Sequence, residues 1–227
     1  MSALFLTGTD TGCGKTSVGV VLAATARARG LRVRVLKPVE TGCEEHDGEA
    51  VPADALRLAR AAGDERELDR ICPYRLRMAA APEVAARREG VLIDPARIEK
   101  VFQDAAADAD LVLVEGAGGL LVPLGPALDM AGLARRFAWP LLLVSRASLG
   151  TLNHTLLSLE AARIRSLAVL GVVVSHTTPD LPPAERANLE LLVARLPVPY
   201  LGELPFGGRK IVPDLDPRTL LSALARS

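Results

Sequence analysis

Several side chains in this sequence have the types and spacing needed to handle a nucleoside triphosphate. Gly14, Lys15 and Thr16 follow an apolar run at 3–6 and precede a helix-like run. In such a loop, backbone N–H groups converge on phosphate oxygens, the lysine places a cation on the β- and γ-phosphates, and the threonine hydroxyl can bind Mg²⁺. A plain turn has no use for a Lys-Thr pair at this position. The pattern therefore predicts a phosphate-binding loop over residues 8–16.

Two carboxylates and a second lysine stand where they could serve the same ligand. Glu115 ends a continuous Leu/Val run and is followed by Gly116. An acidic residue in that place is a natural Mg²⁺ ligand or an acceptor for metal-bound water. Asp54 is either a second such carboxylate or an acid at a helix start that the helix dipole favours. Lys37 ends a strand-like run, from which it either reaches the same cleft or is solvated.

Composition limits the classes of protein to which the chain can belong. Its 227 residues, 49% hydrophobic and 24% charged, predict one globular domain over 1–227. Basic and acidic residues are equal in number, at 27 each, which argues against a nucleic-acid surface. The apolar runs are too short to span a membrane. Three cysteines without CxxC spacing, and a start unlike a signal peptide, predict a cytoplasmic location.

Strand-like and helix-like segments alternate along most of the chain. We expect strands over 3–6, 31–38, 110–115, 141–145, 168–175 and 198–201. We expect helices from Ser17 to Gly30 and over 53–62, 94–107, 128–137, 151–165, 182–196 and 216–225. Residues 41–52 are predicted to form a loop, and residues 63–90 short helices and a loop over the sheet edge.

This alternation predicts an α/β fold with one open, mostly parallel sheet and helices on both faces. Ligands of such sheets bind beyond the carboxyl ends of the strands. The loop at 8–16, Lys37, Glu115 and the segment from Ser145 onward all follow strands, so we expect them at one rim. A helix that starts at Gly150 could hold an anionic group with its free N–H groups.

Short motifs then occur in an order and at a spacing that resemble one enzyme family. These motifs are Gly8-Thr9-Asp10-Thr11, Gly14-Lys15-Thr16, Lys37-Pro38-Val39, Asp54, Val114-Glu115-Gly116-Ala117-Gly118-Gly119, Leu149-Gly150, Asn153-His154, Gly202-Glu203 and Pro205. Together they make residues 3 to about 206 similar to the ATP-dependent dethiobiotin synthetases, which have a three-layer α/β/α fold of the P-loop NTPase type. The strict loop pattern has glycine at position 9, and the shift to Gly8 is itself a mark of this family.

The resemblance implies a ligase reaction in biotin synthesis. One amine of 7,8-diaminononanoate adds to CO₂ to form a carbamate, ATP phosphorylates the carbamate, and the second amine closes a cyclic urea. The products are dethiobiotin, ADP and phosphate. A carbamate is a poor electrophile until its oxygen becomes part of a phosphate leaving group, so the triphosphate and Mg²⁺ must lie beside the diamine. The family also implies a homodimer whose substrate site is completed across the interface.

The resemblance assigns roles residue by residue. It implies catalytic roles for Thr11, Lys15 and Lys37, the last stabilising charge on the carbamate and γ-phosphate, and it places Mg²⁺ on Thr16, Asp54 and Glu115. Nucleotide contacts are implied for Gly12, Cys13, Gly14, Lys15, Thr16, Ser17, Asp54, Glu115, Gly116, Ala117, Gly118, Leu204, Pro205 and Phe206. Contacts to the diamine and its carboxylate tail are implied for Thr41, Gly118, Gly150 and Asn153.

The chain also departs from the family pattern at two places. Gly12 stands where the family often has an acidic residue, and Ser175-His176 stands where it has Asn-Asp. Because that asparagine helps to read the base, we predict looser nucleotide choice in this chain. Phe206 could still stack or pack near the base.

Two alternative functions come from the same superfamily. An amide ligase of the cobyrinic-acid type would need a glutaminase domain with a nucleophilic cysteine, for which 227 residues leave no room. A nucleotide-switched partition or positioning ATPase would carry a signature lysine at the place of Asp10. Asp10 and the neutral charge argue against that class, so dethiobiotin synthesis is the expected function.

Overall fold

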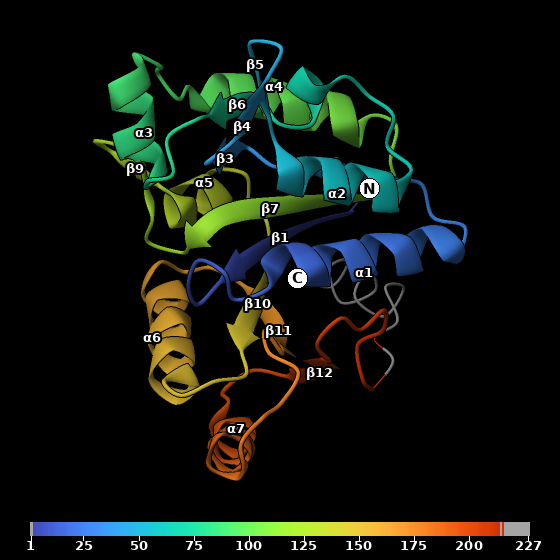
Figure 1. The fold of residues 1–227 in the computed structure, drawn as a ribbon, viewed down its shortest axis with the longest axis vertical. Helices are drawn as coiled ribbons and strands as arrows, with labels where there is room; N and C mark the ends of the chain where they lie inside the picture. Colours follow the sequence, from blue (N-terminus) through green and yellow to red (C-terminus); the bar gives the residue numbers. More distant parts are fainter. Residues whose placement is uncertain (1, 214, 216–227) are drawn as a thin grey trace.

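A parallel sheet lies at the centre of the protein (Figure 1). The computed structural model describes residues 2–213 and 215. Within them, the sheet has six strands in the order β12-β11-β10-β1-β7-β2, and every neighbouring pair is parallel. Its strands are β1 (Ser2–Gly8), β2 (Val33–Leu36), β7 (Leu111–Gly119), β10 (Leu141–Arg146), β11 (Val169–Ser175) and β12 (Tyr200–Leu204). The predicted parallel sheet is confirmed.

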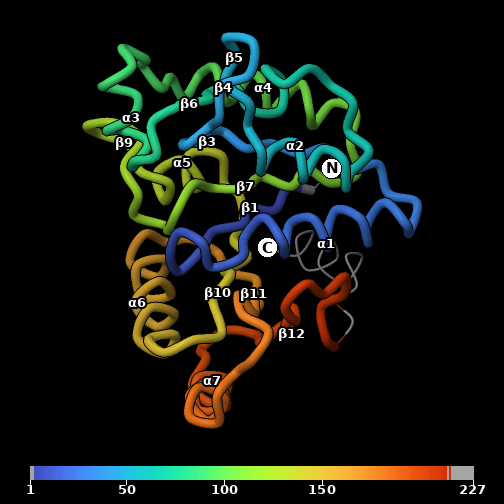
Figure 2. The backbone as a smooth tube through the Cα atoms, viewed as in Figure 1, coloured from blue at the N-terminus to red at the C-terminus, as the bar shows by residue number. Residues whose placement is uncertain are grey.

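Helices cover both faces of this sheet, because successive side chains of a buried strand point to opposite sides. Leu4 and Leu6 of β1 pack with α1 and α2, whereas Phe5 packs on the other face with α4 and α5. The helix α6 lies on that second face, and α7 packs against α6 near the β12 end of the sheet (Figures 1 and 2). The helices are α1 (Lys15–Ala28), α2 (Ala53–Ala62), α3 (Pro82–Glu89), α4 (Pro95–Ala106), α5 (Met130–Arg136), α6 (Thr151–Ile164) and α7 (Pro183–Arg195). The predicted helices over the two faces are confirmed.

Smaller elements extend the β2 side of the molecule. They are β3 (Val39–Thr41) with β6 (Tyr74–Leu76), the hairpin of β4 (Glu44–His46) and β5 (Glu49–Val51), the 3₁₀ helix η1 (Leu68–Arg70), and β8 (Pro123–Gly125) with β9 (Leu128–Asp129). The prediction of a loop over 41–52 is wrong. Asp47 and Gly48 both have positive φ, as the two central residues of a tight hairpin turn require, so the flanking residues pair.

Other element boundaries also differ from the sequence prediction. Residues 63–90 contain short helices as expected, but also β6, which was not predicted. The helix predicted over 128–137 starts at Met130 because 128–129 pair as a strand, and the last strand runs from Tyr200 instead of 198. The predicted helix over 216–225 lies outside the described residues. No helix in the described part is long and apolar enough to cross a membrane.

Candidate active site

Residues 8–16 run from the end of β1 to the first turn of α1 and fold around the side chain of Lys15. Gly12 and Gly14 have φ values of 73° and 95°, a left-handed conformation that favours glycine. Lys15 Nζ donates a hydrogen bond of 3.0 Å to the Asp10 carbonyl and lies 3.9 Å from Cys13 Sγ. α1 begins directly after Gly14, so the first N–H groups of the helix, which have no partner within it, lie at the end of the loop. An anion-binding site at a helix start uses such groups.

The position of the first glycine in this loop has a packing cause. A Cβ atom on residue 8 would lie 2.5 Å from Cys13 Sγ and 2.9 Å from Lys15 Nζ. A side chain there would displace the buried cysteine and the lysine that the loop surrounds. Glycine at position 8 avoids both overlaps.

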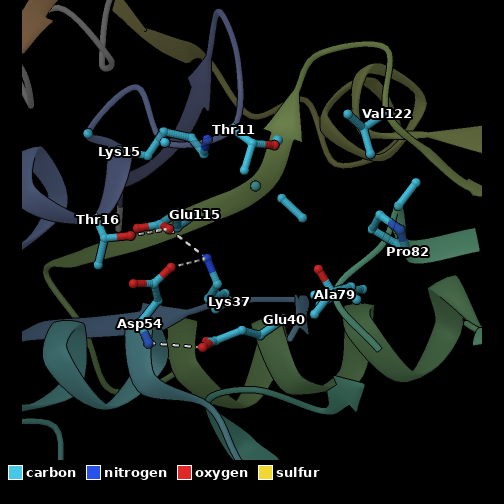
Figure 3. A pocket seen from close by; sticks show the side chains of 18 of the residues that line it. Thr11, Lys15, Thr16, Lys37, Glu40, Asp54, Ala79, Pro82, Glu115 and Val122 are labelled. Atoms are coloured by element: carbon cyan, nitrogen blue, oxygen red, sulfur yellow. Dashed lines mark hydrogen bonds and ion pairs between the residues drawn. The ribbon is translucent and has the colours of Figure 1, made fainter. Parts of the chain in front are cut away.

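Four residues predicted to act together meet at one charged centre (Figure 3). Glu115 Oε1 accepts hydrogen bonds from Thr16 Oγ1 at 2.9 Å and from Lys37 Nζ at 2.6 Å, and Asp54 Oδ2 lies 3.5 Å from Lys37 Nζ. Lys37 and Glu115 are both buried. Burial acts to lower the pKa of Lys37, but attraction to Glu115 and Asp54 outweighs it and raises that pKa above its ordinary value. Lys37 is therefore a fixed cation.

This centre has the chemistry of a magnesium site that is completed by other ligands. Glu115 Oε2 is buried and has no hydrogen-bond partner among the described residues, so an acceptor remains for an ion. The described residues contain no group of three or more His, Cys, Asp or Glu side chains that could hold a metal ion. Mg²⁺ typically takes one or two carboxylates together with phosphate oxygens and water. Thr16, Asp54 and Glu115 fit that kind of site.

Glu40, which sequence reasoning missed, holds the first turn of α2, and with it Asp54, in place. Its Oε1 and Oε2 accept the N–H groups of Asp54 at 2.9 Å and of Ala55 at 3.0 Å, so it caps α2. The residue before α2 is Pro52, which offers no capping side chain. Burial raises the pKa of Glu40, although Lys37 and the two N–H groups oppose the rise. No local pattern could have indicated this cap, since it joins residues fourteen apart in the sequence.

A cavity of about 670 Å³ opens beside the charged centre (Figure 3). Its walls include Thr11, Gly12, Gly14, Lys15, Thr16, Ser17, Lys37, Thr41, Asp54, Glu115, Gly116, Ala117 and Gly118, all of which were predicted site residues. Cys13 lies buried beneath the loop. The far wall is formed by Val122 and residues 79–82. It was missed because residues 63–90 were predicted only as short helices and a loop over the sheet edge, and no role was predicted for Val122.

A second cavity of similar volume lies on the other side of the phosphate loop. Leu204, Pro205 and Phe206 line it together with Val20 and Val21 of α1. Phe206 is 56% exposed, so its ring is accessible to a ligand. These walls offer the apolar surface that a nucleoside needs.

The residues at the family's Asn-Asp position also lie at the second cavity. Ser175 is buried and packs closely against the loop. The contact is so close that a Cβ atom on Gly14 would overlap Ser175 Oγ. His176 Nε2 lies 2.5 Å from Glu203 Oε2. Neither side chain provides an amide at this wall.

Gly150 and Asn153 are not brought to these cavities within the single chain. Gly150, with a φ of 91°, directly precedes α6. Asn153 lines a separate groove with Leu157, Arg195 and Val198. Their predicted contact with the substrate stays a prediction.

Comparison with known proteins identifies the family. A family model described as "AAA domain" matches residues 2–209. ATP-dependent dethiobiotin synthetase BioD of Xylella fastidiosa (strain 9a5c) is 40% identical over 224 residues, which cover 99% of this chain and 97% of that protein. The chain belongs to the dethiobiotin synthetase family. Two further dethiobiotin synthetases support this assignment. That of Aromatoleum aromaticum is 43% identical over 89% of this chain and 90% of its own length. That of Anaeromyxobacter sp. (strain K) is 46% identical over 83% of this chain and 86% of its own length.

Solved structures resemble the chain in fold. The septum site-determining protein MinD of Pyrococcus horikoshii, complexed with Mg-ADP, has a TM-score of 0.53 at 19% identity, over 90% of this chain and 81% of that one. The cell division protein FtsY of Thermotoga maritima has a TM-score of 0.55 at 18% identity, over 98% and 68%. Both likenesses concern the fold alone. The family resemblance seen in the sequence is thus confirmed at the level of sequence relatives, and the P-loop NTPase-like fold at the level of structure.

Proposed function

We propose that this chain, an ATP-dependent ligase of the dethiobiotin synthetase family, closes the cyclic urea of dethiobiotin in the cavity beside Lys37. Its substrates are 7,8-diaminononanoate, CO₂ and ATP, and its products are dethiobiotin, ADP and phosphate. The observation that carries the proposal is the meeting of Thr16, Lys37, Asp54 and Glu115 at a cavity that adjoins the phosphate loop. A triphosphate on that loop would put its γ-phosphate beside a bound diamine.

The proposed steps need a fixed cation where charge develops. An amine nitrogen forms a bond to the carbon of CO₂ and loses a proton, giving a carbamate. A carbamate oxygen then takes the γ-phosphoryl group of ATP, and the second amine attacks the carbonyl carbon as phosphate leaves. Lys37, whose raised pKa keeps it protonated, stabilises the oxygens that carry the charge. Lys15 holds the β- and γ-phosphates, and Thr11 lines the cavity at the loop.

Mg²⁺ would be held by Thr16, Asp54 and Glu115. When bound, it neutralises phosphate charge as the phosphoryl group moves. The buried, unpartnered Glu115 Oε2 supports this assignment. Glu40 contributes indirectly, since it fixes the first turn of α2 that carries Asp54.

The remaining parts of the substrates have their own proposed sites. Thr41 and Gly118 contact the reacting end of the diamine. Gly150 and Asn153 hold its carboxylate tail from a second copy of the chain in a homodimer, which would explain why they do not line the cavity within one copy. The nucleoside lies in the cavity of Leu204, Pro205 and Phe206. The enzyme works in the cytoplasm and needs neither nucleic acid nor a membrane.

The test is to measure ATP hydrolysis with and without the diamine and bicarbonate, with dethiobiotin followed by mass spectrometry. We expect turnover only when both are present. Lys15→Ala should abolish it, whereas Lys100→Ala, which changes an exposed lysine on α4, should not. Hydrolysis that proceeds without the diamine and bicarbonate would contradict the ligase mechanism.

A further inference from the structure

The two cavities share a boundary that one unexpected residue helps to form. Within the described residues, Gly12, Gly14, Ser17 and Arg57 line both cavities. The first three belong to the phosphate loop and the start of α1, whereas Arg57 stands on α2. A nucleotide with its base in one cavity and its γ-phosphate in the other must cross this boundary.

The present contact of Arg57 is weak and easily exchanged. Its Nη1 lies 3.6 Å from Asp54 Oδ1, too far for a hydrogen bond, and its side chain is 52% exposed. Asp54 is shared, because its Oδ2 lies 3.5 Å from Lys37 Nζ. Positive charge bound at Asp54 would weaken the attraction between Asp54 and the guanidinium. The guanidinium would then be available to another anion.

At Gly12, which lines both cavities together with Arg57, the loop carries no acidic side chain that could compete for the guanidinium. A Cβ atom on Gly12 would meet no atom within 4 Å, so the space at this boundary is open. Arginine presents N–H donors in a planar fork that matches two phosphate oxygens. The Arg57 guanidinium therefore stands beside open space at the boundary that the nucleotide has to cross.

We propose that Arg57 binds the α- and β-phosphates of the nucleotide, as a cation additional to Lys15 and Lys37. This inference rests on the proposed function, which puts the nucleoside and the γ-phosphate in the two cavities. It has two consequences. Arg57 strengthens the binding of ATP and ADP alike, because the γ-phosphate lies deeper, beside Lys37 and Glu115. It does so for every base, because it contacts only phosphate.

The test is a calorimetric titration of the protein with Mg-ADP and with a non-hydrolysable Mg-ATP analogue. Arg57→Ala should weaken both about tenfold, which corresponds to about 1.4 kcal/mol, and Arg57→Lys should restore part of the loss. The difference from wild type should shrink as salt is raised. Arg60→Ala is the matched control, since Arg60 is an exposed arginine on the same helix that lines neither cavity. Thermal unfolding without nucleotide should be unchanged in both variants, because surface ion pairs contribute little to stability.

Several results would overturn the proposal. They are an ADP affinity in Arg57→Ala within about twofold of wild type, an increased affinity, a loss limited to the ATP analogue, or an equal loss in Arg60→Ala. An increase would mean that Arg57 merely competes for Asp54. If the wild-type protein bound neither nucleotide, the proposed function would fail instead.

Discussion

Replacing Lys37 by methionine should destabilise the protein as well as stop its chemistry. The substitution keeps most of the side-chain volume but removes the ammonium group that lies 2.6 Å from Glu115 Oε1. The two side chains are only 5% and 2% exposed, so Glu115 would remain as a buried charge without its cation. Breaking such a pair by removing one partner typically costs about 3–5 kcal/mol. We expect the free energy of unfolding to fall by about that amount.

The assay is urea denaturation without nucleotide or Mg²⁺, applied to Lys37→Met, Glu115→Gln and the double variant. The double variant removes both charges of this pair, so neither is left buried without its partner, and it should recover most of the stability that Lys37→Met loses. In the protein that remains folded, turnover should fall about 100-fold or more while ADP affinity is nearly unchanged. Lys100→Met, on the exposed surface of α4, is the control.

Two results would refute this reasoning. A loss of less than about 1 kcal/mol in Lys37→Met would mean that water or another group compensates Glu115, contrary to its burial. A collapse of ADP affinity together with turnover would make Lys37 a nucleotide-binding residue instead of one that acts on the reacting groups.

Three further predictions concern a helix cap, an acid-sensitive residue and the base. Asp94 caps α4 with a hydrogen bond of 2.8 Å, so Asp94→Ala should lower the urea-measured unfolding free energy by about 1 kcal/mol and Asp94→Asn by much less. Burial raises the pKa of Asp64, but Arg66 and the Val35 N–H outweigh it and hold that pKa below its ordinary value. The stability that Asp64 contributes is therefore present above an ordinary aspartate pKa of about 3.9, and it is lost as pH falls through the lower folded pKa. In thermal unfolding between pH 2 and 6, the midpoint temperature of Asp64→Asn should therefore fall less with decreasing pH than that of the wild type. Because Ser175 offers no amide, turnover with ATP, CTP and GTP should be similar, and a strong preference for ATP would contradict this.

Much of the sheet and the charged centre could be predicted because their signals are local. Continuous Leu/Val runs indicate buried parallel strands, and Gly14-Lys15-Thr16 has one physical use. Once the strands are parallel, their carboxyl ends share a rim, which brings Lys37 and Glu115 together. For Cys13 the family resemblance implied only a nucleotide contact, and the structure adds a packing role, since its buried side chain lies 3.9 Å from Lys15 Nζ.

The rest depends on contacts that no short window contains. The cap from Glu40 to α2 joins residues that lie on either side of the β4–β5 hairpin in the sequence. That hairpin was missed because its strands have only three residues each, and neither alternates between apolar and polar side chains. The wall at 79–82 takes its place from β6, a three-residue strand held by pairing with β3. Arg57 looks like any exposed helical arginine until two cavities are seen to meet at it.

The strand that carries the phosphate loop, β1, lies between β10 and β7, both supplied by later parts of the chain (Figure 1). As the ribosome extends the chain, β1 therefore has neither neighbour until at least residue 119 has emerged, and not both until residue 146. Such distant pairings form late in folding, since the chain must close long loops before it gains their contacts. A nucleotide binds only the folded protein, in which the sheet is assembled, so it stabilises that state relative to the unfolded chain. The substrate should therefore slow unfolding but do little to speed folding, and the nascent chain must build its sheet without it.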